Sequence, residues 1–253
     1  MGARIAEIWR YPLKSHGREK LAQTVLTPGA ALPFDRAWAV THEASRFDAD
    51  NPGWAPCSNF SIGSKNPALM AITARLDEGA RRLTLSHPER PDFTFCPEAR
   101  ADIWRFLDWL EPLVEPARAR PTGIVSAPGR AMTDTDYPSV SILSLDSLDA
   151  LSEAAGQRLS PARFCGNIWL SSLPAWAEFD LLGQEITLGN ARLKVVERIR
   201  RCRATTADPE TGKITVDTLS LLNERWGHQD FGVYAEVIEG GEIAPGDAMR
   251  VAA

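Results

Sequence analysis

The sequence is organised around one stretch, Arg198 to Gly212, which reads RIRRCRATTADPETG. A single cysteine, Cys202, stands there among four arginines, shortly after an apolar run at 193–197 that is typical of a β-strand. Cations beside a thiol favour the thiolate, which is the form that binds a soft metal or attacks an electrophile. Arginine side chains also match the geometry of phosphate groups. The stretch therefore predicts a thiol next to an anion site, while a strand edge with solvated arginines and a half-buried cysteine is the simpler interpretation.

The composition is that of an ordinary globular protein. The chain has 253 residues, of which 44% are hydrophobic and 24% charged, enough for one large domain or two small ones. Its formal net charge of −5 argues against a general nucleic-acid-binding protein. No apolar run approaches the roughly 18–20 residues of a membrane-spanning helix, and the chain opens on a strand-like run at 4–10 without a signal segment. We therefore expect a cytoplasmic protein that has neither nucleic acid nor a membrane among its partners.

The cysteines indicate free thiols. They are Cys57, Cys96, Cys165 and Cys202, and no two of them form a Cys-x-x-Cys pair. We therefore expect neither a structural zinc site nor an iron–sulfur cluster in this chain. A cysteine that binds a metal here does so almost alone, so another molecule has to supply the remaining ligands.

Short strands dominate the predicted secondary structure. Ser144 and Gly156 are expected to cap one helix, and Asp217 and Gly227 a second. The apolar spacing within 103–110 predicts a third helix. Strands are expected at 4–10, 37–40, 123–126, 140–143, 168–170, 184–188, 191–197 and 231–237, and after the turn at 246–247. Many short strands with few helices predict a mainly β fold of the α+β class that contains a barrel.

The segment 40–118 differs from its surroundings. From about 44 to 66 it is rich in Asp, Asn, Pro, Gly and Ser, which predicts a loop. Two short strands at 69–76 and 82–86 and the helix at 103–110 follow it. We expect this segment to form a compact β/α piece. The tryptophans are assigned to core, rim or interface packing: Trp38, Trp104, Trp109, Trp169 and Trp176.

An ordered set of short motifs runs from residue 11 to residue 247. Each motif is weak evidence by itself, but the ordered set is specific. It resembles the MOSC (molybdenum cofactor sulfurase C-terminal) family, in the branch that includes the mitochondrial amidoxime-reducing component and its bacterial relatives. The motifs are Tyr11-Pro12-Leu13-Lys14-Ser15, Asp35-Arg36, Asp136-Tyr137-Pro138, Arg163-Phe164-x-Gly166-Asn167, Arg201-Cys202-x-x-Thr205-Thr206-x-Asp208-Pro209-x-Thr211-Gly212, Phe231-Gly232-x-Tyr234 and Gly241-x-Ile243-x-x-Gly246-Asp247.

The resemblance implies a fold and a domain organisation. A MOSC-type β-barrel domain is expected to take residues 1–39 and 119–253, with an N-terminal MOSC-associated β/α subdomain inserted at 40–118. The changes in composition at both seams agree with this division.

The resemblance also implies a cofactor, the molybdenum cofactor, in which molybdopterin carries the metal. It places the protein ligand of the metal, and with it the catalytic centre, on Cys202. A soft thiolate suits such a site. Residues that match cofactor-lining positions or belong to the same motifs are Lys14, Ser15, Arg36, Tyr137, Pro138, Arg163, Asn167, Arg201 and Thr205.

The chain departs from the resemblance at one position. Relatives carry an arginine where this chain has Cys165, so the implied phosphate clamp has one cation fewer unless Arg163 or Arg203 replaces it. Asp136 is a candidate proton relay near the metal, and equally a turn-capping carboxylate. The polar run at 228–230 is interpreted as a loop and not as a catalytic group.

The implied function is a molybdenum-dependent reductase of N-hydroxylated small molecules: amidoximes, hydroxylamines or N-hydroxylated bases. Electrons would come from a separate iron–sulfur or flavin protein. The alternative is a non-catalytic carrier of the cofactor or of sulfur, in which Cys202 holds a persulfide. A barrel that has lost its cofactor is the third possibility, because Cys165 replaces a cation.

Overall fold

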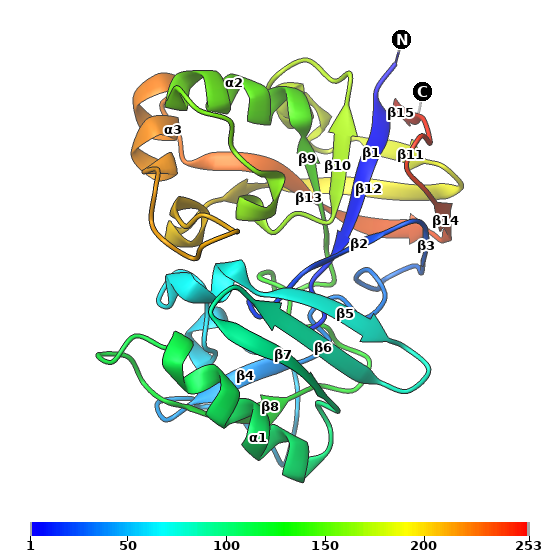
Figure 1. The fold of residues 1–253 in the computed structure, drawn as a ribbon. Helices are drawn as coiled ribbons and strands as arrows, with labels where there is room; N and C mark the ends of the chain where they lie inside the picture. The colour runs from blue at the N-terminus through cyan, green and yellow to red at the C-terminus, as the bar shows by residue number, and fades with distance from the viewer. Residues whose placement is uncertain (1, 252–253) are drawn as a thin grey trace.

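The computed structural model describes residues 2–251 and shows a mainly β protein with three α-helices in that range (Figure 1). This confirms the predicted fold class. Residues 1, 252 and 253, at the ends of the predicted domain ranges, lie outside the described residues. Within the described range, no helix has both the length and the apolar character that crossing a membrane requires.

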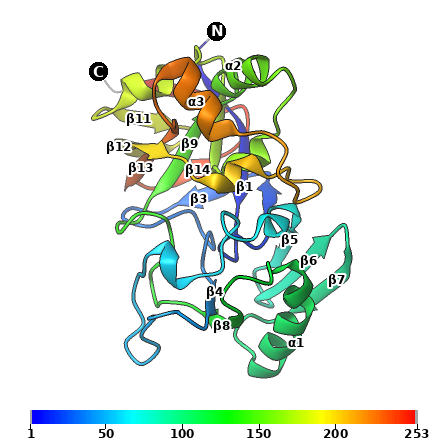
Figure 2. The same ribbon diagram turned by 90° about the vertical axis from the view of Figure 1, so that its left-hand side faces the viewer.

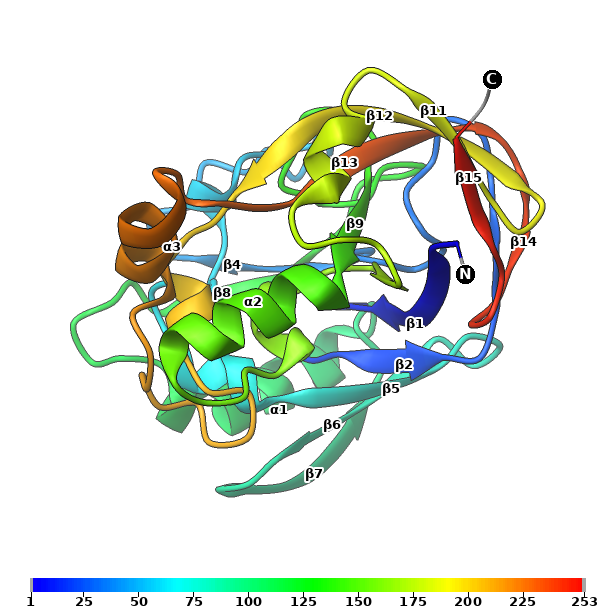
Figure 3. The ribbon, with the colours of Figure 1, turned by 90° about the horizontal axis from the view of Figure 1, so that it is seen from above.

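The main sheet has eight strands and curls into a half-barrel (Figure 3). Backbone hydrogen bonds from Ile5 N to Asp247 O (2.9 Å) and from Met249 N to Ala3 O (2.8 Å) bridge its first strand in sequence to its last. Only β9 and β10 run parallel, because α2 connects them. In spatial order the strands are β15 (Met249–Val251), β11 (Glu185–Leu188), β12 (Ala191–Arg200), β13 (Asp230–Glu239), β9 (Val140–Ser144), β10 (Ile168–Ser171), β1 (Arg4–Arg10) and β2 (Glu19–Leu21).

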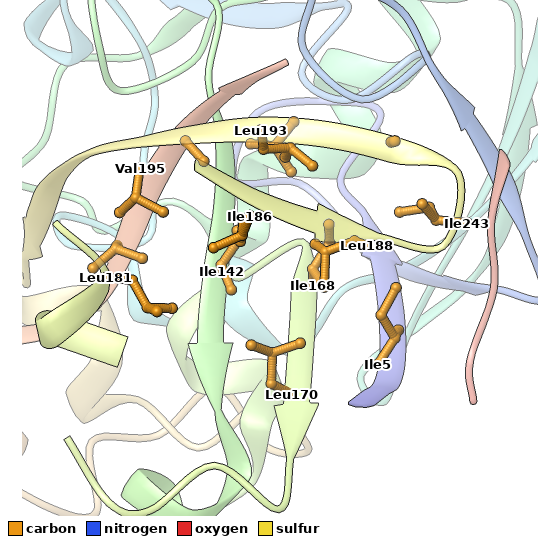
Figure 4. Packing of buried hydrophobic residues seen from close by; sticks show 14 of the residues in the cluster. Ile5, Ile142, Ile168, Leu170, Leu181, Ile186, Leu188, Leu193, Val195 and Ile243 are labelled. Atoms are coloured by element: carbon orange, nitrogen blue, oxygen red, sulfur yellow. The ribbon is translucent and has the colours of Figure 1, made fainter. Parts of the chain in front are cut away.

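Alternating apolar residues on these strands build the larger core. Along the first half of β12 every second residue is buried, so Leu193 and Val195 point into the half-barrel. Figure 4 shows them in one apolar cluster with Ile142, Ile168 and Ile186, which come from β9, β10 and β11 of the curled sheet. Full burial of each such side chain stabilises the fold by roughly 1.5–3 kcal/mol.

A second group of strands lies at the other end of the molecule (Figure 2). Its core stacks Phe95 on Phe106 with ring centroids 4.8 Å apart, and Leu13 and Trp38 join the same cluster. The boundaries of the inserted subdomain, expected at residues 40 and 118, remain a prediction. The elements are β4 (Ala39–His42) paired with β8 (Pro121–Val125), a sheet of β5 (Thr73–Asp77), β6 (Arg82–His87) and β7 (Arg90–Phe95), and α1 (Arg100–Leu110).

The predicted helix caps are confirmed. Helix α2 (Leu145–Ala155) begins where the Ser144 side chain accepts a hydrogen bond from Ser147 N and ends at Gly156, which has φ 66°. Helix α3 (Thr218–Trp226) begins where Asp217 accepts from Ser220 N and ends at Gly227, with φ 74°. Left-handed φ values at these ends favour glycine.

The strand predictions need correction in two places. The strand expected at 69–76 starts at Thr73, because Pro67–Ala71 forms a 3-10 helix with proline in its first turn. Trp38 and Trp169 are buried as expected, whereas Trp104 is 58% exposed, so its assignment to an interface stays a prediction. Strands β7 and β14 (Gly241–Ile243, paired with β3, Thr24–Leu26) were not predicted, since proline and glycine interrupt their apolar pattern.

Buried His16 predicts a pH-dependent stability. Its side chain is fully buried, its Nδ1 lies 2.7 Å from Lys14 O, and its Nε2 has no hydrogen-bond partner in the described part of the chain. Burial lowers the pKa of His16 to about 4. As the pH falls, the histidine of the unfolded chain takes up a proton before that of the folded chain does. The His16 contribution to the free energy of unfolding is therefore fully present above about pH 6.5, and roughly 3 kcal/mol of it is lost as the pH drops towards 4.

Urea unfolding of wild type and His16→Gln between pH 7 and 4.5 checks this. The variant keeps a donor for Lys14 O and should lose less stability over that range. His42→Gln, at a half-buried histidine, should follow the wild type. Parallel curves for wild type and His16→Gln would contradict the assignment.

Candidate functional site

A cavity of about 280 Å³ lies where segments from distant parts of the sequence meet. Among them are the turn after β1, the 57–64 part of the irregular loop, the turn at 134, the 3-10 turn at 163–165 and the end of β12 through residue 205. The segment expected to be a loop thus supplies one wall of the cavity. The predicted residues that line it are Lys14, Ser15, Arg36, Arg163, Arg201, Cys202 and Thr205.

Cys202 stands at the mouth of this cavity. It follows β12 and precedes the 3-10 helix Arg203–Thr206. The Thr205 N–H and hydroxyl both donate to the Cys202 carbonyl, at 3.2 and 3.1 Å, and so hold the backbone in place. The residue is exposed, and the thiol is free. Cys202 therefore lines the cavity with a thiol that is open to a ligand.

Two cations that line the cavity, exposed Arg200 and half-buried Arg201, have no ion pair within residues 2–251. The Arg201 guanidinium donates to Phe231 O (2.8 Å) and to Phe164 O (2.7 Å), and within residues 2–251 none of its hydrogen bonds reaches an acid. The charge also lies 5.7 Å from the centre of the Phe164 ring. Burial lowers the pKa of Arg201, although nearby acidic groups oppose this. A half-buried cation without a counter-ion favours an anionic ligand.

Lys14 and Arg36 are neutralised within the site. Lys14 Nζ donates to Met132 O (2.8 Å) and forms an ion pair with Asp134. Arg36 forms an ion pair with Asp35 and donates to Cys165 O at 2.9 Å. Burial opposes ionisation of Asp134, but the charges of Lys14 and Arg36 outweigh it and hold the pKa of that carboxyl well below its usual range. Asp134 is 48% exposed because it faces the open cavity.

Tyr11 lines the cavity and carries an unpaired, buried hydroxyl. The residue is 4% exposed, and its Oη has no hydrogen-bond partner among residues 2–251. The Arg36 guanidinium lies 5.0 Å from the centre of its ring. Burial, reinforced by nearby Cys165, raises the pKa of Tyr11 well above its usual value, so the phenol stays a donor. Its orphaned hydroxyl marks a position where a ligand can accept a hydrogen bond.

The cysteine that replaces the expected arginine also lines the cavity. Cys165 has φ 49°, and burial raises the pKa of its thiol to about 11, so it adds no charge at neutral pH. Arg163, one of its two expected substitutes, donates to Thr206 O (3.2 Å), Asp208 (3.0 Å) and Thr215 (2.7 Å). Its guanidinium is therefore largely occupied by the loop at 206–215.

Four predicted residues lie outside the main cavity. Asn167 lines a side pocket of about 10 Å³, where its carboxamide oxygen accepts from Ser141 N and Oγ at 3.1 and 2.8 Å. Asp136 is exposed, and Tyr137 donates its hydroxyl to Glu197 at 2.7 Å. Neither they nor Pro138 line a cavity found within residues 2–251. The carboxylate of this turn that does face the site is Asp134.

Sequence reasoning passed over several lining residues: Tyr11, Cys57, Asp134 and Tyr234. Tyr11 and Tyr234 belong to motifs given above, so the sequence did indicate them, whereas Cys57 lies in a loop segment that contains none of those motifs. Cys57 donates its thiol to Asp134 at 3.2 Å, and burial raises the pKa of that thiol to about 11. Within the described range, no group of three or more His, Cys, Asp or Glu residues is arranged to hold a metal ion.

Two curated proteins are similar to this chain. It is 30% identical to the mitochondrial amidoxime-reducing component 1 of Mus musculus over 242 residues, which covers 82% of this chain and 66% of the relative. It is 36% identical to the Xenopus laevis protein of the same name over 128 residues, which covers 45% of this chain and 37% of that relative. The chain thus spans just under two thirds of the mouse relative.

Two solved structures resemble the fold. The YuaD protein from Bacillus subtilis aligns with a TM-score of 0.47 at 12% identity, covering 99% of this chain and 96% of that one. YiiM from Geobacillus stearothermophilus aligns with a TM-score of 0.34 at 18% identity, and the alignment covers 45% of this chain and 54% of YiiM.

Two family models match consecutive parts of the chain. Residues 2–106 match the MOSC N-terminal beta barrel domain, and residues 130–250 match the MOSC domain. The second range holds Cys202, Arg201 and Asp134, while the first supplies Tyr11, Lys14 and Arg36 to the same cavity. With nearly its whole length matched in this order, the chain belongs to the MOSC domain family.

Proposed function

We propose that the chain binds the molybdenum cofactor in this cavity and reduces N-hydroxylated compounds: amidoximes, hydroxylamines or N-hydroxylated bases. The observation that carries the proposal is an exposed thiol, Cys202, beside a cation that lacks a counter-ion, Arg201. Both curated relatives are named as amidoxime-reducing components, which supports the reaction class.

The chemistry of the donor set fits such a cofactor. A thiolate at Cys202 is a suitable soft ligand for molybdenum. The guanidinium of Arg201 suits an anionic group, and the orphaned Tyr11 hydroxyl can donate to the pterin or the phosphate. A second phosphate-binding cation is missing from position 165, so Arg201 carries most of that role.

The proposed reaction is R–NHOH + 2e⁻ + 2H⁺ → R–NH₂ + H₂O. When bound, the cofactor supplies the two-electron chemistry that breaks the N–O bond. The chain orients the reactants, and its Lys14–Asp134 ion pair lies at the cavity wall. Asp134 lines the cavity and Asp136 does not, so Asp134 is the carboxylate that a bound substrate can reach. A separate iron–sulfur or flavin protein supplies the electrons.

The exposure of Cys202 also favours a second candidate function. A thiol that partners can reach suits a carrier that holds a persulfide or passes on the cofactor. Elemental analysis with a sulfide-release assay separates the two: molybdenum with reductase activity supports the enzyme, and labile sulfur without molybdenum supports the carrier.

Replacing Cys202 tests the ligand assignment. Cys202→Ser should lower the molybdenum content of protein made in a cofactor-producing host by at least about tenfold, because a direct ligand is lost. Molybdenum per chain is measured by inductively coupled plasma mass spectrometry. Cys96→Ser, at a thiol that lines no cavity found within the described residues, should keep the wild-type content, as should Cys165→Ser. Full occupancy in Cys202→Ser would refute the assignment.

Tyr11→Phe tests the orphaned hydroxyl. Removal of a buried, unpaired hydroxyl should leave the free energy of unfolding of cofactor-free protein unchanged or raise it by about 1 kcal/mol. The same change should lower cofactor retention about fivefold, since one hydrogen bond to the ligand is lost. Denaturant unfolding and pterin release on dialysis measure the two effects.

Tyr137→Phe is the matched control. It removes a hydroxyl that bonds Glu197 outside the cavity, so it should leave cofactor retention unchanged. Equal loss of cofactor from both variants would contradict the role given to Tyr11.

A further inference from the structure

A second hollow adjoins the mouth of the main cavity. It measures about 210 Å³, and Ser64 lines both. Arg203 and Thr206 line the second hollow, and they directly follow Cys202 and Thr205, which line the first. A ligand that reaches Cys202 from outside therefore passes beside the second hollow.

Unpaired positive charge is concentrated there. Lys65, Arg118 and Arg203 line the hollow and are exposed, and no ion pair within residues 2–251 involves any of them. Glu115 is the only carboxylate in its lining, which leaves an excess of two positive charges. In the main cavity, by comparison, three cations (Lys14, Arg36 and Arg163) have a carboxylate partner, and two (Arg200 and Arg201) have no ion pair within residues 2–251.

The groups present match an oxyanion. Two guanidinium groups and an ammonium group provide charge-assisted donors, and the Ser64 hydroxyl adds another donor at the edge shared with the main cavity. Ile214, 55% exposed, adds an apolar edge. A concave site of this size suits a small ligand better than the flat face of a protein partner.

We infer that this hollow binds a phosphate monoester carried by the N-hydroxylated substrate. The substrate class is an N-hydroxylated compound that carries a phosphate monoester, with the phosphate between Lys65, Arg118 and Arg203 and the N–OH end towards Cys202. The reacting end rests on the proposed function. The phosphate site does not, since it depends only on charge and shape.

Calorimetric titration of adenosine 5′-monophosphate against adenosine tests the site directly. Neither compound is reducible, so the measurement is independent of metal content and reductase activity. At low salt the monophosphate should bind about tenfold more tightly than the nucleoside. A salt concentration of about 0.5 M should remove most of this preference, because exposed charges are screened.

Variants locate the binding. Arg203→Gln, and the double variant Lys65→Gln with Arg118→Gln, should each weaken monophosphate binding severalfold and leave adenosine binding unchanged. Arg75→Gln, at an exposed arginine on β5 that lines neither hollow, is the matched control and should behave like the wild type.

Three results would overturn the inference. The first is equal affinity for the two compounds. The second is a monophosphate preference that survives in all the variants, which would place the anion beside Arg201 in the main cavity. The third concerns the Arg203→Gln variant and the Lys65→Gln, Arg118→Gln double variant. If they bind the monophosphate like the wild type but accept electrons more slowly from an acidic iron–sulfur protein, the hollow is part of a protein-docking surface.

Discussion

The geometry of the candidate site depends on how Arg201 is held. Its guanidinium donates to the carbonyls of Phe164 and Phe231, which belong to a 3-10 turn and to β13. Phe164 and Phe231 themselves stack with ring centroids 4.3 Å apart, so both carbonyls sit on a packed aromatic platform. This arrangement sets the end of β12 against two other elements. Cys202, the next residue, is thereby placed at the cavity mouth.

The same arrangement decides the charge of the cavity. The carbonyl groups satisfy the donors of Arg201 but do not cancel its charge, whereas Asp134, Asp35 and Asp208 neutralise Lys14, Arg36 and Arg163. Five cations line the cavity, and within residues 2–251 two of them, Arg200 and Arg201, have no ion pair. Further uncompensated charge lies outside, on Lys65, Arg118 and Arg203, so the site separates an inner anion position from an outer one.

Local patterns predicted much of the fold. The capping residues Ser144 and Asp217 and the glycines at 156 and 227 act on neighbours within a few positions, so sequence spacing was enough to place both helices. The strands expected at 184–188 and 191–197 are also present, and they pair as an antiparallel hairpin. Predictions that depended on which side chain of a turn faces the cavity were less successful. In the turn at 133–137, Thr133 and Thr135 donate to backbone carbonyls of the same turn, and Asp134 faces the cavity while Asp136 is exposed.

The sequence by itself determined the order of the motifs, the strand-rich fold class and the thiol among arginines, because each depends on residue type and short spacing. Only the tertiary structure decided which of those residues share a cavity and which charges remain free. Lys14 pairs with Asp134, 120 positions away, and Arg36 with the carbonyl of Cys165, 129 positions away. No local rule specifies such pairs, because they form only when the curled sheet brings distant turns together.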